Sequence, residues 1–180
     1  LAMEDRLIVY GSRYGATKRY AVELAKRLKV QAVEFQHARN ISAFRTIIYV
    51  GALYAGGVLG LDKTLKHIKN IDYTQLIIIT VGLADPQNPE NVEHIRTGIK
   101  SIVEEPVFGK LRIFHLRGAI TYAKLGFMHK MMMKMVYHKA KKTPKEQQTQ
   151  EIKAMIATYN KQVDFVDFNT LDPILRQIQA

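Results

Sequence analysis

The sequence predicts an α/β fold in which an open parallel sheet of five strands carries helices on both faces. Strand-like and helix-like segments alternate along the chain, as they do in sheets built from strand–helix–strand units. The first predicted strand contains a continuous apolar run at 7–10, which is typical of a strand covered on both faces. The 180 residues, 47% of them hydrophobic, are enough for one buried core. We therefore expect residues 1–180 to form a single domain.

The predicted elements follow one another regularly. The strands are expected at about 6–10, 30–35, 46–51, 76–82 and 110–118. The helices are expected at about 17–28, 61–69, 89–104, 125–141, 144–160 and 170–179. Asn88 followed by Pro89 is typical of a helix start. A capping box with proline at its first helical position is predicted at Thr143-Pro144-Lys145-Glu146, and Asp172 before Pro173 is expected to open the last helix in the same way.

The loop after the first strand suits a phosphate group. Ser12, Gly15 and Thr17 supply two short hydroxyls and a flexible backbone at the start of the helix predicted at 17–28. Free N–H groups and the helix dipole favour a phosphate dianion there. Two hydroxyls that flank a glycine need neither a metal nor a lysine to hold a terminal phosphate, and this favours a mononucleotide such as FMN.

Two commoner phosphate-binding loops do not fit this segment, and two alternatives stay open. A Walker A loop is excluded, because only a short segment separates Gly11 from Gly15 and no Lys-Ser/Thr pair follows. A dinucleotide G-x-G-x-x-G loop is excluded by Arg13. Glu34, at the end of the second strand, leaves NAD as a minor alternative. An ordinary strand–helix turn with Ser12 as the N-cap is the other alternative.

Three strand ends are rich in glycine and apolar residues, at 51–57, 81–85 and 118–122. Ligands of open α/β sheets bind beyond the carboxyl ends of the strands, and small residues let a flat ring approach the backbone. Tyr54 and Tyr122 are candidates to stack on such a ring. The alternative is that both tyrosines are packing residues at the rim.

The composition excludes several chemistries. The chain has no cysteine, which excludes disulfides, thiolate metal sites, iron–sulfur clusters and cysteine nucleophiles. Its six histidines form no H-x-x-x-H pair, so no metal site is expected. The formal net charge is +11, and residues 106–145 contain ten Lys or Arg and no Asp or Glu. The basic charge is therefore local and predicts one cationic surface.

A basic, methionine-rich helical segment is predicted at about 119–142. At 100° per residue its polar face would carry Lys130, Lys134, His138 and Lys141. Its apolar face would carry Leu125, Met128, Met132, Met135 and Val136, broadened by Met131 and Met133. Such a helix can lie on an anionic membrane or bind an acidic partner, and methionine suits contact with a quinone tail or a porphyrin edge. The alternative is a helix packed on the sheet with solvated lysines.

The chain shows no apolar run of 18 residues and no leader pattern. We expect a cytoplasmic protein, with peripheral attachment at the inner face of the membrane as the variant that the basic helix suggests. Nucleic acid is not an expected partner, because the sequence has no helix-turn-helix, RNP motif or aromatic–basic sheet face.

These motifs together resemble the flavodoxin-like FMN-binding fold, which implies the strand order 2-1-3-4-5. Ser12, Gly15 and Thr17 match its [TS]-x-T-G-x-T loop, and Tyr14 replaces the middle threonine. Within that fold the chain is similar to bacterial menaquinone-dependent protoporphyrinogen oxidases. The matching segments are Arg13-Tyr14-Gly15-Ala16-Thr17, the 51–56 loop, the Gly-Ala-x-x-Tyr segment at 118–122 and the Met-Lys helix at 127–135.

The resemblance implies an FMN-dependent oxidoreductase that oxidises protoporphyrinogen IX in haem biosynthesis and passes electrons to a quinone. The alternative is a flavodoxin-type electron carrier. Such carriers dock through an acidic rim, whereas this chain is basic at 106–145. The positive charge suits a propionate-bearing substrate, or an anionic membrane met by Lys130, Lys134 and Lys141. No catalytic residue is named, because flavin N5 would accept the hydride. The implied cofactor-binding residues are Ser12, Arg13, Tyr14, Gly15, Ala16, Thr17, Ala52, Leu53, Tyr54, Ala55, Gly56, Gly82, Leu83, Ala84 and Tyr122.

Overall fold

The computed structural model describes residues 4–54, 56–71 and 74–180. Its central sheet has five parallel strands in the order β2-β1-β3-β5-β6, and a short strand, β4, pairs antiparallel with β3. The bounds are β1 Glu4–Gly11, β2 Gln31–Glu34, β3 Phe44–Tyr54, β4 Gly57–Val58, β5 Gln75–Gly82 and β6 Arg112–Arg117. When the parallel strands alone are numbered along the chain, their order is 2-1-3-4-5, and the predicted topology is confirmed.

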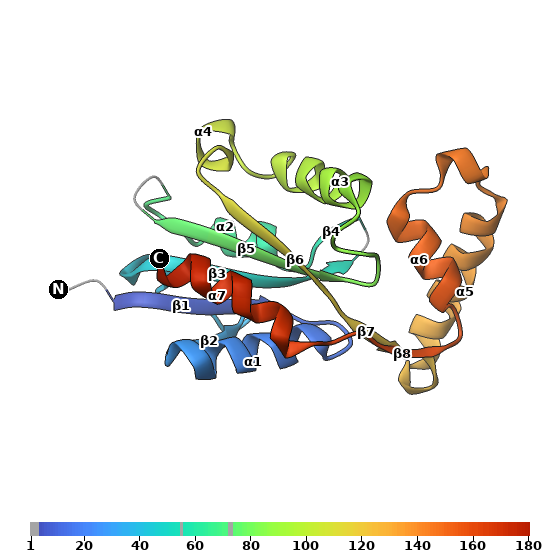
Figure 1. Cartoon of the computed structure of the whole chain (residues 1–180), viewed down its shortest axis with the longest axis horizontal. Helices are drawn as coiled ribbons and strands as arrows, with labels where there is room; N and C mark the ends of the chain where they lie inside the picture. The colour runs from blue at the N-terminus through green and yellow to red at the C-terminus, as the bar shows by residue number, and fades with distance from the viewer. Residues whose placement is uncertain (1–3, 55, 72–73) are drawn as a thin grey trace.

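Helices cover both faces of this sheet (Figure 1). The helices are α1 Ala16–Leu28, α2 Leu61–Leu65, α3 Pro89–Lys100, α4 Glu105–Phe108, α5 Phe127–Lys142, α6 Gln150–Thr158 and α7 Leu171–Gln179. One core cluster joins the strands to α1 and α7, and the other joins them to α2, α3 and α4. Successive strand residues alternate between the two clusters: Ile8 packs with Leu24 of α1, whereas Leu7 and Val9 pack with Ile99 of α3. This double burial explains the continuous apolar runs.

The predicted start of α3 is confirmed, and that of α6 is wrong. The Asn88 side chain accepts hydrogen bonds from the Glu90 and Asn91 amides at 2.9 and 3.2 Å. Thr143, by contrast, closes α5, and its hydroxyl donates to the Lys139 carbonyl at 3.2 Å. A short 3-10 turn, η3 Lys145–Gln147, follows. Helix α6 begins only at Gln150, where the Thr149 side chain accepts from the Ile152 amide at 3.2 Å.

Other boundaries also differ from the prediction. Helices α2 and α3 end at Leu65 and Lys100, before the predicted ends at 69 and 104. Helix α7 begins at Leu171 with Thr170 as its N-cap, so the Asp172-Pro173 pair lies inside its first turn. The 3-10 helices η1 Ile41–Ala43, η2 Tyr122–Lys124 and η4 Phe168–Thr170 were not predicted.

Helices α5 and α6 lie together beyond the carboxyl ends of the parallel strands (Figure 1). They are flanked by β7 Ala119–Thr121 and β8 Gln162–Asp164, which form an antiparallel ribbon that the sequence did not predict. The ribbon joins both ends of the α5–α6 segment to the edge of the sheet. Within the described residues, no helix is long and apolar enough to cross a bilayer.

Candidate functional site

The sheet register brings the three strand ends to one edge. Gly11 of β1 lies opposite Gly51 of β3, and Gly51 lies opposite Thr80 of β5. Gly82 at the end of β5 lies opposite Arg117 of β6. The loops after β1, β3 and β5 therefore emerge side by side, as the strand-end argument predicts for an open α/β sheet.

The first loop presents free amides at the start of α1. Gly15 has φ 97°, and a Cβ there would meet nothing within 4 Å, so glycine is needed for its conformation and not for space. The Arg19 amide donates to the Gly15 carbonyl at 3.1 Å. Among the described residues, the Ala16 and Thr17 amides have no acceptor. These two N–H groups, at the positive end of the helix dipole, suit an anion.

The two hydroxyls of the loop are used differently. Ser12 Oγ accepts a hydrogen bond from the Lys18 amide at 3.3 Å, within the first turn of α1. The N-cap of α1 is Gly15, without a side-chain cap, so the alternative with Ser12 as the N-cap is wrong. Thr17 lines a cavity and is 2% exposed. Its hydroxyl has no hydrogen-bond partner in the described part of the chain. Thr17 is therefore the hydroxyl available to a ligand.

The cavity at this sheet edge measures 490 Å³, within the range of about 300–1,000 Å³ that is usual for ligand sites. Of the predicted cofactor residues, its lining includes Arg13, Tyr14, Ala16, Thr17, Ala52, Leu53, Tyr54, Gly56, Gly82, Leu83 and Ala84. Gly15 lines an adjoining hollow together with Arg13 and Ala16. Ser12 lines neither space, and Ala55 lies outside the described residues.

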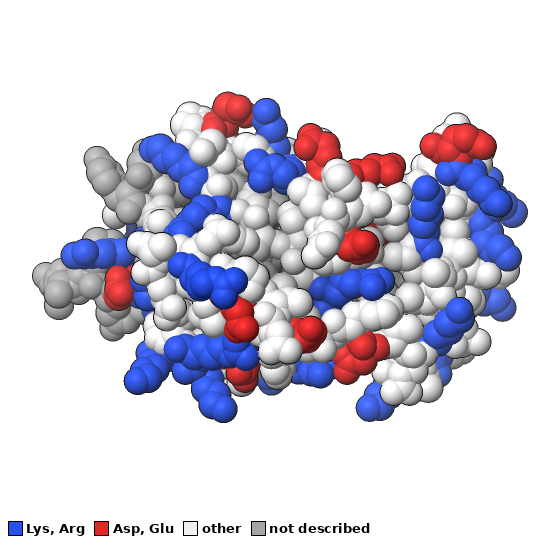
Figure 2. All heavy atoms as spheres, in the orientation of Figure 1, with Lys and Arg blue, Asp and Glu red and all other residues white. Residues whose placement is uncertain are grey.

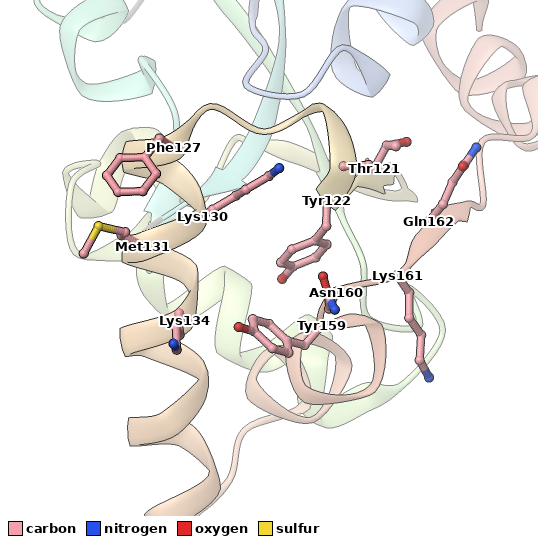
Figure 3. A pocket seen from close by; sticks show the side chains of 11 residues that line it. Thr121, Tyr122, Phe127, Lys130, Met131, Lys134, Tyr159, Asn160, Lys161 and Gln162 are labelled. Atoms are coloured by element: carbon pink, nitrogen blue, oxygen red, sulfur yellow. The ribbon is translucent and has the colours of Figure 1, made fainter.

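Tyr122 is not placed to stack on a ring in this cavity. It begins η2, whose 3-10 turn directs its side chain to a different pocket, on the other face of α5 (Figure 3). There it is 5% exposed and meets the Tyr159 ring edge-to-face, with 5.3 Å between ring centroids. The sequence gives no information on this turn, because the direction of the ring is set by contact with a residue distant in the chain.

Arg13 joins the first loop to the second strand end and to α5. Its guanidinium lies 4.9 Å from the centroid of the Tyr54 ring and contacts the His129 ring. The Tyr54 hydroxyl donates to the Met132 sulfur at 3.8 Å. Burial, with a smaller effect from nearby Tyr54, raises the pKa of Tyr14, and Arg13 opposes this shift. The wall formed by these side chains is cationic and aromatic.

The third loop is fixed by hydrogen bonds to its own sheet edge. Arg117 Nε donates to the Leu83 carbonyl at 3.0 Å, and the Gly118 amide donates to the Gly82 carbonyl at 2.8 Å. A Cβ at Gly82 would lie 2.7 Å from Leu53 Cδ1. A larger residue at this position would therefore displace the Leu53 side chain, which lines the same cavity.

The far side of the cavity is a roof that sequence reasoning did not assign to the site. It is formed by apolar side chains of α5 and α6, namely Met132, Met133, Val136, Ile152 and Met155. Next to this roof, the cavity is also lined by Glu151 of α6 and His94 of α3, which are both ionisable. Burial raises the pKa of the Glu151 carboxyl, and nearby His94 opposes this shift. The i, i+3 spacing of Ile152 and Met155 was the available clue to an inward-facing side of α6.

The predicted apolar face of α5 is wrong in part. Met132 and Val136 do lie on an apolar side, which faces the cavity, but Met128 is 77% exposed and Met135 is 72% exposed. They form an exposed apolar stripe with Phe127 and Met131. The helix packs mainly on α6, so it buries a narrower face than periodicity alone suggests. Lys130, Lys134, His138 and Lys141 are exposed as expected, and Figure 2 shows basic atoms over this end of the molecule.

No group of three or more His, Asp or Glu side chains that could hold a metal ion occurs among the described residues. The arrangement is thus a helix start with free amides beside a largely apolar cavity. Such a site can hold a phosphate at one end and a flat ring at the other.

Comparison with known proteins identifies the family. The family model described as "Flavodoxin domain" matches residues 7–147, well over half of the chain. A solved structure of a candidate flavoprotein from Bacteroides eggerthii DSM 20697 is similar with a TM-score of 0.42 and 8% identity, over 63% of this chain and 86% of that one. A comparison with curated proteins found no significant match.

Proposed function

This chain belongs to the flavodoxin domain family, and on that premise we propose that it binds FMN and acts as a flavin-dependent oxidoreductase. The residues fit the cofactor. The free amides of Ala16 and Thr17, with the Thr17 hydroxyl, would hold the phosphate. Arg13, which lines both the cavity and the adjoining hollow, would add positive charge at the same end.

The isoalloxazine ring would lie at the ends of β3 and β5. Ala52, Gly82 and Ala84 leave room for a flat ring to approach the backbone. Tyr54 lines the same cavity and is held by Arg13 and Met132, so it is positioned to contact the ring. When bound, FMN supplies an acceptor for two electrons and a proton, and the chain's own residues supply position and field.

One observation favours an enzyme over an electron carrier, namely the roof of α5 and α6 over the cavity. A carrier must expose the ring edge to a protein partner. Here Met132, Val136 and Met155 lie across the cavity from the strand ends. Adaptable methionine side chains suit contact with a flat apolar substrate. Glu151 and His94, beside the same roof, are the residues available to accept or donate a proton.

We propose a substrate of the protoporphyrinogen type, with a quinone as the electron acceptor. The resemblance to menaquinone-dependent protoporphyrinogen oxidases supports it, and so does the charge: residues 106–145 carry ten Lys or Arg and no Asp or Glu. The same charge would let α5 meet an anionic membrane through Lys130, Lys134 and Lys141. The exposed stripe of Phe127, Met128, Met131 and Met135 beside these lysines suits the apolar layer below the headgroups.

Titration of the purified protein with FMN and with riboflavin tests the cofactor assignment. The phosphate should account for much of the affinity. The fluorescence of FMN should therefore be quenched at a far lower protein concentration than the fluorescence of riboflavin. Equal affinity for the two flavins would contradict the phosphate site.

Stopped-flow mixing of the FMN-loaded protein with protoporphyrinogen tests the enzyme assignment. The flavin absorbance should bleach and then recover when a menaquinone analogue is added. If neither change occurs, and the protein instead passes single electrons from a reductase to a cytochrome, the carrier alternative is correct.

A further inference from the structure

A second pocket lies on the face of α5 that points away from the flavin cavity (Figure 3). Its volume is 410 Å³, within the range of small-molecule sites. Lys130 and Lys134 of α5 form one wall, and Tyr122 and Tyr159 form the other. No acidic residue is among the residues that line it. A ligand here would therefore meet uncompensated positive charge.

The Tyr122 hydroxyl is the unusual feature of this pocket. It is buried, and it has no hydrogen-bond partner among the described residues. Buried polar groups are nearly always paired, and an unpaired one is destabilising. Figure 3 shows the hydroxyls of Tyr122 and Tyr159 directed into the space beside α5, with the Lys130 side chain extending toward Tyr122. The Tyr122 hydroxyl thus lacks an acceptor, and the pocket is where an acceptor would come from.

The pocket also has an apolar side. Phe127 and Met131 line it and are 75% and 49% exposed. Both belong to the exposed stripe of α5, so the apolar side continues onto the protein surface. Cationic and apolar groups thus lie next to one another over a short distance.

We propose that this pocket binds an anionic amphiphile, with a phosphate or carboxylate head held by Lys130, Lys134 and the Tyr122 hydroxyl, and an apolar body on Phe127 and Met131. Burial, with smaller effects from Tyr14 and Tyr159, raises the pKa of Tyr122 to about 12, so the phenol remains a donor at neutral pH. The inference does not rest on the flavin assignment, because none of these five residues lines the flavin cavity. Tyr122 is the residue that separates it from the membrane contact proposed above, which uses only the surface of α5.

Hexyl phosphate and hexanol are matched probes, because they share the apolar body and differ in the head. Calorimetric titration of the full chain, with and without FMN, should give at least about tenfold tighter binding of hexyl phosphate. Tyr122→Phe should weaken hexyl phosphate binding about tenfold, since a hydrogen bond to a charged group is lost. The matched control Tyr137→Phe removes the same atom from a ring outside the pocket and should have no effect.

Two further variants keep the proposal testable. The double variant Lys130→Gln/Lys134→Gln should also weaken binding, whereas Lys139→Gln, on the same helix but outside the pocket, should not. In the absence of ligand, Tyr122→Phe should unfold at or above the wild-type temperature, because it removes an unpaired buried hydroxyl. Equal binding of hexyl phosphate and hexanol would overturn the proposal, as would unchanged hexyl phosphate binding by both Tyr122→Phe and the double variant.

Vesicles distinguish the source of the ligand. If the natural head is a lipid phosphate, phosphatidylglycerol vesicles should displace hexyl phosphate from the wild type, and Tyr122→Phe should bind these vesicles more weakly. If the natural ligand is a free metabolite, hexyl phosphate should bind equally well with and without vesicles. Absence of binding to both hexyl phosphate and the vesicles would overturn the site.

Discussion

Thr17 and Ser12 carry the same functional group in one loop, and the fold gives them different roles. Thr17→Val keeps the shape of a residue that is 2% exposed and removes only the hydroxyl that faces the cavity. We expect FMN to bind roughly 10- to 150-fold more weakly, because one hydrogen bond to a charged phosphate is lost. In a fluorescence titration, Ser12→Ala should retain nearly wild-type affinity, since Ser12 Oγ is engaged with the Lys18 amide. A larger loss in Ser12→Ala than in Thr17→Val would reverse the assignment.

Because His115 is largely buried, we expect the free energy of unfolding to fall in mild acid. It lies in β6 with Nδ1 2.7 Å from the Thr80 hydroxyl, and burial, with a smaller effect from Arg96, lowers its pKa to about 4. Between about pH 6.5 and 4 the unfolded chain binds a proton that the folded chain does not, so the stability should fall as the pH falls through this window. One pKa unit corresponds to about 1.4 kcal/mol, so the fall of the His115 pKa from 6.5 to about 4 makes the total effect at most roughly 3.5 kcal/mol.

Urea unfolding at several pH values measures this effect. His115→Asn retains a polar group beside Thr80 but does not titrate, so its stability should depend less on pH in this window. His67→Asn, at an exposed position in a turn, is the control for replacing a histidine with asparagine. Identical pH profiles for His115→Asn and the wild type would assign the acid sensitivity to other groups.

At the level of single residues, a site residue could be predicted where the backbone of a regular element fixes its position. Ala52, Gly82 and Ala84 could be assigned because the end of a parallel strand fixes where they lie. Tyr122 could not, because the 3-10 turn at η2 and the distant Tyr159 determine where its ring points. Met128 and Met135 failed for a related reason: helical periodicity says which residues share a face, but it does not say how wide a face the neighbouring element will cover.

Helix α6 gives a direct comparison between the predicted cap and the observed one. Thr149→Ala removes the side chain that accepts from the Ile152 amide, and loss of an N-cap typically costs about 1 kcal/mol. Thr143→Ala removes only a hydroxyl bonded to the Lys139 carbonyl at the end of α5 and should cost less. Chemical denaturation of both variants tests this, and the reverse order of stability would favour the cap that the sequence suggested.

At the level of elements, the parallel strands and their order were predictable, because long apolar runs alternate with amphipathic segments. The β7–β8 ribbon was not, because its strands span only Ala119–Thr121 and Gln162–Asp164. Segments this short carry too few residues for a period of two to be visible. The site shows the same division: its floor comes from the predicted strand ends, and its roof depends on the ribbon that sets α5 and α6 over them.

In the whole molecule, the C-terminal segment joins the roof to the core. Residues 148–180 lie outside the matched family region, yet Leu171, Ile174 and Ile178 of α7 pack in the same cluster as α1. Asp164 of β8 pairs with Arg19 of α1 at 3.0 Å, and Asp172 of α7 pairs with Arg27 at 2.9 Å. The chain therefore leaves the sheet edge at β7, forms the roof, and returns through β8 to the face covered by α1.

The distribution of charge predicts how the whole molecule meets a membrane. Helix α5 carries five lysines and no acidic residue, and its exposed apolar stripe lies beside Lys130 and Lys134. Each lysine near an anionic bilayer contributes about 1 kcal/mol, so Lys130→Gln/Lys134→Gln/Lys141→Gln should weaken binding to phosphatidylserine vesicles roughly 100-fold at low salt. The wild type should also dissociate as salt rises, because the Debye length falls from about 10 Å at 0.1 M to about 3 Å at 1 M.

The control is a variant with the same change in net charge on a different face of the protein. Lys18→Gln/Lys26→Gln/Lys29→Gln alters exposed lysines on and next to α1, away from the apolar stripe, so it should sediment with anionic vesicles nearly as the wild type does. Both triple variants should bind FMN normally, because none of the six lysines lines the flavin cavity. If the two variants lose binding equally, net charge and not α5 governs attachment. If the wild type partitions equally into neutral and anionic vesicles, or into neither, the lysines of α5 have no role at a membrane.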